Sequence, residues 1–114
     1  MISKEILDKL FKYIAWNIEN MEDLTLKKNL TKEEWILQNL ACVIEEVWEL
    51  SAEVRKMTKM SFSKTKCDNF KFEDLEEEIA DVLITTLALA KTVWIDNLDE
   101  IIKRKIKKNN DRGY

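Results

Sequence analysis

The fold is decided by residues 79–90, which read IADVLITTLALA. A helix built from this stretch is apolar on almost every side, as is typical of a helix at the centre of a bundle. Helical spacing continues in both directions, so we predict a helix from about Phe72 to Trp94. Such a helix is stable in water only when other helices cover it, so the rest of the chain must supply that cover.

A second long helix is predicted upstream of the central one. Thr31 begins the sequence Thr-Lys-Glu-Glu, a capping box in which the Thr31 hydroxyl accepts a hydrogen bond from the Glu34 amide and Glu34 reaches back. The helix that starts there carries apolar residues at steps of four and three, the spacing of a bundle or coiled-coil seam. This apolar seam consists of Ile36, Leu40, Val43, Val47, Leu50, Val54 and Met57.

Two weaker patterns flank this pair. Helical spacing predicts a first helix from about Lys4 to Asn20, and the polar residues 21–30 are expected to form a connection. Residues 61–69 are polar and break the period, so we expect a loop there. The inner side of the first helix is predicted to consist of Ile6, Leu7, Leu10, Tyr13, Ile14 and Trp16.

The last element is a short helix that Asn97 and Glu100 cap and that reaches about Asn109. The sequence therefore predicts an all-α fold, a small bundle of about four helices in a single domain over residues 1–114. Its two long helices carry more apolar face than a bundle of this size can cover. We therefore expect a homodimer, or else a tetramer.

Composition removes several classes of protein. The chain has no Pro and one Gly, Gly113, so the primed turns of β-hairpins are scarcely available and an all-β fold is excluded. It has no His, which excludes Ser-His-Asp catalysis, HExxH proteases and zinc sites that contain His. The net charge of −3 argues against a nucleic-acid partner.

We expect a cytoplasmic protein without a membrane partner. Residues 1–10 carry four charges and do not resemble a signal peptide, and the apolar run 79–95 is too short and too charged to span a membrane. Cys42 and Cys67 form no CxxC pattern. We predict two free thiols, one packed and one in a loop.

Asp81 is the one charge within the apolar stretch 79–90. A buried carboxylate costs several kcal/mol unless a cation or hydrogen-bond donors compensate it. Glu78 lies three residues earlier on the same side of the helix, and Glu46 and Glu49 have the same spacing on the preceding long helix. If the two helices pack side by side, these four carboxylates converge.

Such a cluster would require a cation. Unit charges ~4 Å apart repel by about 4 kcal/mol per pair at an effective dielectric constant near 20. Ligands that are all oxygen favour Mg²⁺ first and Mn²⁺ second. The alternative is that these acids are solvated helix surface, which the spacing alone leaves open. Glu76 and Glu77 are predicted to be surface residues.

Residues 45–49 read EEVWE, and after 28 intervening residues 78–81 read EIAD. This pattern resembles the EExxE and ExxD signature of the MazG-like nucleotide pyrophosphohydrolases, a family of the all-α NTP pyrophosphatase superfamily. Residues 97–112 resemble the family's C-terminal block, so the resemblance covers about Leu40 to Tyr114. The chain departs from the family at Trp48, where relatives usually carry a small residue, and at Gly113, where they often carry an aromatic one.

The resemblance implies a helical, oligomeric hydrolase that converts nucleoside triphosphates to monophosphates and pyrophosphate with Mg²⁺, in nucleotide-pool house-cleaning. By the family's pattern, the metal ligands are Glu46, Glu49, Glu78 and Asp81, Glu45 activates or positions water, and the phosphates are held by Lys105, Asn109 and Arg112.

A nucleobase requires an aromatic or apolar slot, for which we select Trp16 and Trp35 from the available rings, although a helical aromatic is more often a core residue. A competing interpretation is a non-catalytic helical module that uses the apolar seam to bind a partner. Asp81 argues against that module, because a binding seam gains nothing from a charge inside its most apolar helix.

Overall fold

The computed structural model describes residues 2–27 and 30–113, with the backbone alone for residue 15 and residues 17–27. The described chain folds into five helices and no strand, which confirms the all-α prediction. The helices are α1 (Lys4–Lys27), α2 (Lys32–Met57), α3 (Lys64–Asp68), α4 (Phe72–Thr92) and α5 (Leu98–Asp111).

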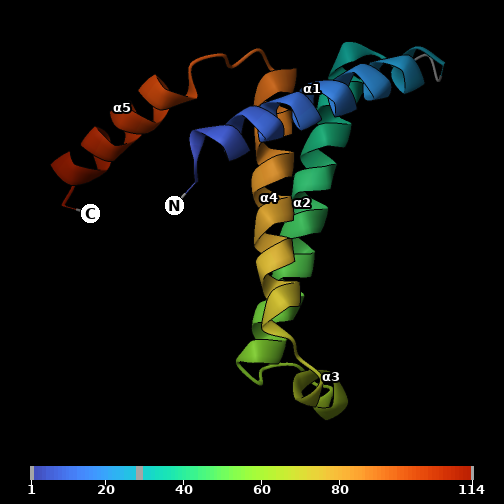
Figure 1. Ribbon diagram of the computed structural model, residues 1–114, viewed down its shortest axis with the longest axis vertical. Helices are drawn as coiled ribbons and strands as arrows, with labels where there is room; N and C mark the ends of the chain where they lie inside the picture. The colour runs from blue at the N-terminus through green and yellow to red at the C-terminus, as the bar shows by residue number, and fades with distance from the viewer. Residues whose placement is uncertain (1, 28–29, 114) are drawn as a thin grey trace.

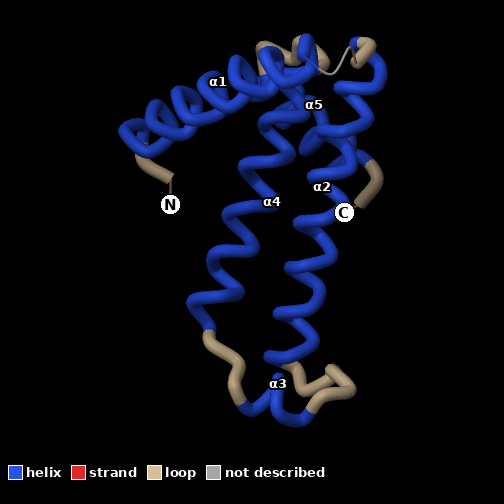
Figure 2. The backbone as a smooth tube through the Cα atoms, turned by 90° about the vertical axis from the view of Figure 1, so that its right-hand side faces the viewer, coloured by secondary structure: helices blue, strands red, loops and turns tan. Residues whose placement is uncertain are grey.

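The long helices α2 and α4 lie side by side and run in opposite directions, and they form the main contact between helices in the chain (Figure 1). We call this pair the hairpin. The short helix α3 closes one end, where the chain turns from α2 to α4, and α1 crosses the other end and packs on α4 (Figures 1 and 2). The last helix, α5, extends away from the hairpin (Figure 1).

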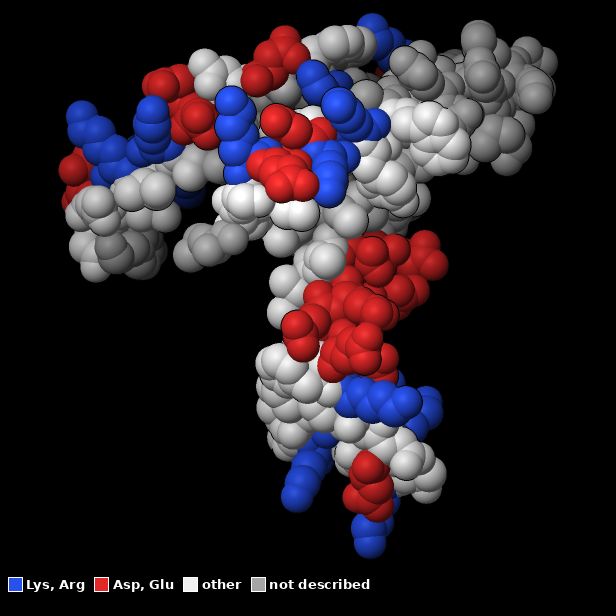
Figure 3. Space-filling model, viewed as in Figure 1, with Lys and Arg blue, Asp and Glu red and all other residues white. Residues whose placement is uncertain are grey.

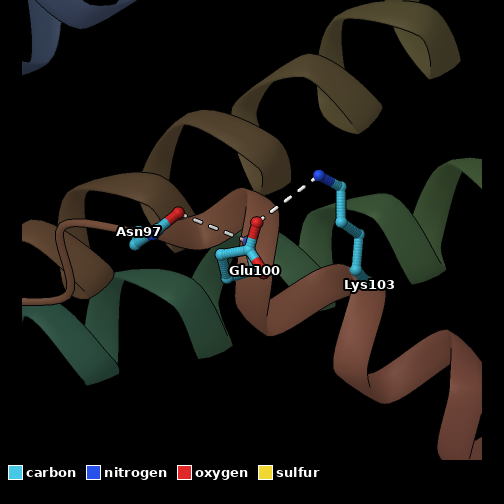
Figure 4. Close-up of polar contacts among 3 residues, drawn as sticks. All are labelled: Asn97, Glu100 and Lys103. Carbon is cyan, nitrogen blue, oxygen red and sulfur yellow. Dashed lines mark hydrogen bonds and ion pairs between the residues drawn. The ribbon is translucent and has the colours of Figure 1, made fainter.

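Both predicted helix caps are confirmed. The Thr31 hydroxyl accepts from the Glu34 amide at 3.1 Å and donates to the Glu34 carboxylate at 3.1 Å, so Glu34 reaches back to the hydroxyl. At the start of α5, the Asn97 side chain accepts from the Glu100 amide at 3.3 Å, and the Glu100 carboxylate pairs with Lys103 at 3.4 Å (Figure 4). These local contacts fix where α2 and α5 begin.

The ends of α2 and α4 use residues other than glycine in the left-handed region. Lys59 and Trp94 both have φ of 59°. One residue further on, the Met60 amide donates to the Arg55 carbonyl at 2.8 Å and the Ile95 amide donates to the Ala90 carbonyl at 2.9 Å. Hydrogen bonds of this kind close the C-terminal end of a helix. The left-handed residue just before each of them, here Lys59 or Trp94, is usually a glycine. This stop places the end of α4 at Thr92.

Two predicted connections were wrong. Helix α1 continues to Lys27, through most of the predicted connection 21–30, because residues 21–27 contain good helix formers and neither Gly nor Pro. The predicted loop 61–69 contains α3, since the Ser63 hydroxyl caps it by accepting from the Lys66 amide at 3.2 Å. Cys67 therefore lies in a short helix and not in a loop, and both cysteines are free and half-buried.

The side of α2 that is buried is not its apolar seam. The buried residues of α2 are Trp35, Asn39 and Glu53, which share one side of the helix. The seam lies next to that side and stays largely open, with Val47 48% exposed. On α1 only Ile14 of the predicted inner side is buried, and Ile6, Tyr13 and Trp16 are exposed.

A single chain leaves much apolar surface uncovered. It exposes 9250 Å², whereas a folded monomer of this mass exposes about 6,600 Å². Its radius of gyration is 17.2 Å, against about 13 Å for a compact domain of this length. The predicted central helix is accordingly open on one side, and Asp81, predicted to be buried, is exposed because no described helix covers that side of α4.

Candidate metal centre

The hairpin brings three glutamates from two helices together. Glu46 and Glu49 lie about one turn apart on α2, and Glu78 faces them from α4. One carboxylate oxygen from each lies within 4.8 Å of the other two. We call these three residues the carboxylate cluster. Acidic side chains form a continuous patch on the hairpin (Figure 3).

Asp81, the fourth predicted ligand, lies beside the cluster. It is exposed on α4, and it is not one of the residues whose oxygens meet within 4.8 Å. Its charge nevertheless acts on the cluster, since it raises the pKa of both Glu46 and Glu78. Three of the four predicted ligands are thus brought together, and the fourth is within electrostatic reach.

The cluster is electrostatically strained without a cation. Burial raises the pKa of Glu46 and of Glu78 above the ordinary carboxyl value, and the neighbouring Glu49 and Asp81 charges raise both further. Burial disfavours the ionised form of a carboxylate, and nearby like charges add to that effect. The cluster therefore binds protons more readily than isolated glutamates do.

The donor atoms fit a hard divalent cation. The Oε2 atoms of Glu46 and Glu78 are buried and have no hydrogen-bond partner among the described residues. Buried polar atoms in native proteins nearly always have a partner, and unpaired ones require an explanation such as an ion. Oxygen ligands on facing helices suit Mg²⁺ or Mn²⁺.

Sequence reasoning missed Glu53, which the structure places next to the cluster. Glu53 is 8% exposed and its Oε1 lies 2.6 Å from the Lys56 Nζ. Its charge contributes to the raised pKa of Glu78. The signal was present in the sequence, because Glu53 follows Glu49 by four residues and therefore lies on the same side of α2.

The other predicted site residues lie outside the cluster. Glu45 is exposed on α2 and points about 100° away from Glu46. Trp35 is buried near the start of α2, about 16 Å from Glu46 along the helix axis. Trp16 is 61% exposed on α1. Glu76 and Glu77 are exposed, as predicted.

The predicted phosphate-binding residues Lys105, Asn109 and Arg112 belong to α5 and its C-terminal cap. Because α5 extends away from the hairpin, a single chain does not bring these residues to the carboxylate cluster (Figure 1). Lys105 and Arg112 are exposed and Asn109 is half-buried.

A helical hairpin whose facing sides hold a carboxylate cluster is the kind of site that helical-bundle metalloproteins build between facing helices. The family model of the MazG nucleotide pyrophosphohydrolase domain matches residues 35–113. The chain therefore belongs to the MazG nucleotide pyrophosphohydrolase family. No curated protein and no solved structure gives a significant match.

None of the described helices combines the length and the apolar character that a membrane span requires.

Proposed function

We propose that this chain hydrolyses nucleoside or deoxynucleoside triphosphates to monophosphates and pyrophosphate, with Mg²⁺ as cofactor and Mn²⁺ as a substitute. The observation that carries the proposal is the convergence of Glu46, Glu49 and Glu78, two of which have buried oxygens without partners. Membership of the MazG family supports the reaction class. The proposed role is cytoplasmic house-cleaning of the nucleotide pool.

In this proposal the carboxylate cluster and Asp81 hold the cation. When bound, the cation would supply positive charge to the triphosphate oxygens and acidify a water molecule. Glu45 accepts a proton from the water that attacks the α-phosphorus, and the bond from that phosphorus to the bridging oxygen breaks. The products are the monophosphate and pyrophosphate.

Lys105, Asn109 and Arg112 are proposed to hold the phosphates, since Arg and Lys both bind phosphate oxygens well. Because α5 extends away from the hairpin of its own chain (Figure 1), the proposal requires α5 of a second copy to lie against the cluster. The protein is therefore proposed to act as a dimer, or as a tetramer built from dimers. Trp16 and Trp35 remain the proposed base contacts, and Trp16 offers the more exposed ring.

The non-catalytic alternative keeps one supporting observation, the exposed apolar seam of α2. The argument against it from a buried Asp81 no longer holds, because Asp81 is exposed. The unpartnered buried oxygens of Glu46 and Glu78 replace that argument. A surface that only bound a partner would gain nothing from them.

The test is pyrophosphate release from a mixture of dNTPs in the presence of Mg²⁺. We expect release by the wild-type protein, none after EDTA treatment and none with Glu49→Gln, which removes the charge of a central ligand at nearly constant shape. Glu76→Gln is the matched control, because it removes an exposed carboxylate from α4 outside the cluster. If the wild-type protein releases no pyrophosphate from any dNTP or NTP, the enzyme proposal is wrong.

A further inference from the structure

Glu53 is the one charged residue that is buried in the part of the chain that the structure describes, with 8% of the residue and 11% of its side chain exposed. It lies in the second half of α2, among helix residues that are mostly half-buried or exposed. Burying a carboxylate is costly, and native proteins accept that cost where the charge is paired and fully hydrogen-bonded. The two oxygens of Glu53 differ in this respect.

One oxygen is paired and the other is not. Oε1 lies 2.6 Å from the Nζ of Lys56, whose side chain is 26% exposed. Oε2 is buried and has no hydrogen-bond partner among the described residues. A surface pair at this i, i+3 spacing contributes little to stability and would not require burial of the acid. Lys56 therefore fixes the carboxylate but leaves one buried acceptor without a donor.

The free acceptor lies close to the carboxylate cluster. Glu53 follows Glu49 by four residues on the same side of α2, and its charge raises the pKa of Glu78 on the facing helix. Its oxygens nevertheless do not join the three that meet within 4.8 Å. Glu53 is thus not one of the ligands that meet directly in the cluster. A water molecule held at the cluster can donate a hydrogen bond to a side chain one helical turn further along α2, which is where Glu53 lies relative to Glu49.

We propose that Glu53 is an outer-sphere ligand of the divalent cation site, with Oε2 accepting a hydrogen bond from a cation-bound water while Lys56 holds Oε1. The proposal rests on the metal site of the proposed function and extends it by a residue outside the EExxE and ExxD signature. Mg²⁺ in proteins keeps several of its waters, which are strong donors. Residues that bind such waters orient the site, and their loss costs about 10- to 100-fold in metal affinity.

The proposal is tested by calorimetric titration of Mn²⁺ into the oligomeric protein without nucleotide. We expect Glu53→Met, which lacks an acceptor, to bind Mn²⁺ about 10- to 100-fold more weakly than the wild type. Glu53→Gln keeps an acceptor but loses the charge, so its loss should be smaller. The matched control Glu76→Gln removes one exposed charge from α4 and should change the affinity less than about threefold.

Lys56→Met separates this role from a purely structural pair. It leaves the Glu53 acceptor in place and removes a competing positive charge, so Mn²⁺ affinity should stay the same or rise while the melting temperature of the metal-free protein falls. If Glu53 served only as the partner of Lys56, the Glu53 and Lys56 variants would lower the melting temperature alike and leave Mn²⁺ affinity unchanged. Glu53→Asp keeps the charge, shortens the reach by one methylene and provides the same test should Glu53→Met not fold.

The outcomes distinguish this inference from the proposed function. If the wild type binds Mn²⁺ and releases pyrophosphate while the Glu53 variants bind Mn²⁺ equally well, only the role of Glu53 is wrong. If the Glu53 variants and Glu76→Gln weaken binding equally, the effect is general electrostatics and the inference is also wrong. If the wild type takes up no Mn²⁺, the inference fails together with the metal site.

Discussion

Glu46 on α2 and Glu78 on α4 present carboxylate oxygens within 4.8 Å of each other, and the Oε2 atom of each is buried and has no hydrogen-bond partner among the described residues. Two helices that pack only for stability would place apolar side chains at this contact. The hairpin instead places like charges there, which costs stability unless a cation binds. Several properties of the metal-free and metal-bound protein follow from this contact.

Mg²⁺ should raise the melting temperature. A ligand that binds only the native state stabilises it by about 2.7 kcal/mol at a hundred times its dissociation constant, and here it also relieves carboxylate repulsion. For a domain of this size that corresponds to a shift of several degrees. Calorimetric scans with and without Mg²⁺, at one protein concentration, measure it. A melting curve that neither Mg²⁺ nor Mn²⁺ moves would contradict the carboxylate site.

The metal-free protein should lose stability as the pH rises above the ordinary carboxyl pKa. The folded state raises the pKa of Glu46 and Glu78, so between the unfolded and folded values it binds more protons than the unfolded state does. The stabilising contribution of these groups is present below the unfolded pKa of about 4.5 and is lost as pH rises through the folded pKa. Denaturant titrations across this range should show a weaker fall for Glu78→Gln than for the wild type. An identical pH profile for both would show that Glu78 is not perturbed.

Asp81→Asn should abolish pyrophosphate release and leave the fold intact. Asn is nearly isosteric with Asp and removes only the charge, and Asp81 is exposed beside like charges. The free energy of unfolding of the metal-free protein should therefore stay constant or rise slightly. Turnover and denaturant unfolding are measured on the same sample. Full turnover by this variant would remove Asp81 from the metal ligands, and its unfolding would make Asp81 a structural residue.

Local patterns in the sequence predicted local features well. The Thr31 and Asn97 caps fixed two helix starts, and the i, i+3 spacing of the glutamates placed Glu46, Glu49 and Glu78 on facing sides once α2 and α4 paired. The extent of α1 and the existence of α3 were missed because no Gly or Pro marks their ends, and propensity alone does not place a boundary.

The buried side of α2 was harder to predict. Apolar periodicity reports every surface that a helix buries, including surfaces that another chain covers. The seam through Val47 stays open in one chain, while the neighbouring side of α2 with Asn39 and Glu53 is buried within the hairpin. Polar residues gave no periodic apolar signal, so Glu53 was missed as part of the site. The exposed seam is therefore the observation behind the dimer prediction, which light scattering can test.

The protein should form a stable dimer at micromolar concentration, with tetramer as the alternative. The exposed surface exceeds that of a typical monomer by far, and a shallow apolar hollow on α2 is lined by Val43, Ile44, Val47, Trp48 and Ser51. Together with the exposed apolar seam of α2, this hollow is the kind of surface that a second copy would cover. Multi-angle light scattering measures the mass, and Val47→Glu should shift it toward the monomer. A wild-type monomer at that concentration would contradict the prediction.

Lys105→Ala should weaken triphosphate binding without disturbing the metal site. Lys105 is exposed on α5, which extends away from the hairpin of its own chain (Figure 1). Because Lys105 is proposed to hold the phosphates and not the cation, its loss should raise KM for the nucleotide and leave Mn²⁺ affinity in the absence of nucleotide unchanged.

If α5 of one copy serves the cluster of the other, a Lys105→Ala chain and a Glu49→Gln chain each retain one half of a site. Mixing the two inactive or weakened homodimers under exchange conditions should then form one intact site per heterodimer and recover part of the turnover. If mass spectrometry confirms the exchange but no turnover is recovered, then either Lys105 and Glu49 act within one chain or Lys105 does not contact the substrate. The KM of Lys105→Ala decides between the two, because an unchanged KM would mean that Lys105 does not contact the substrate.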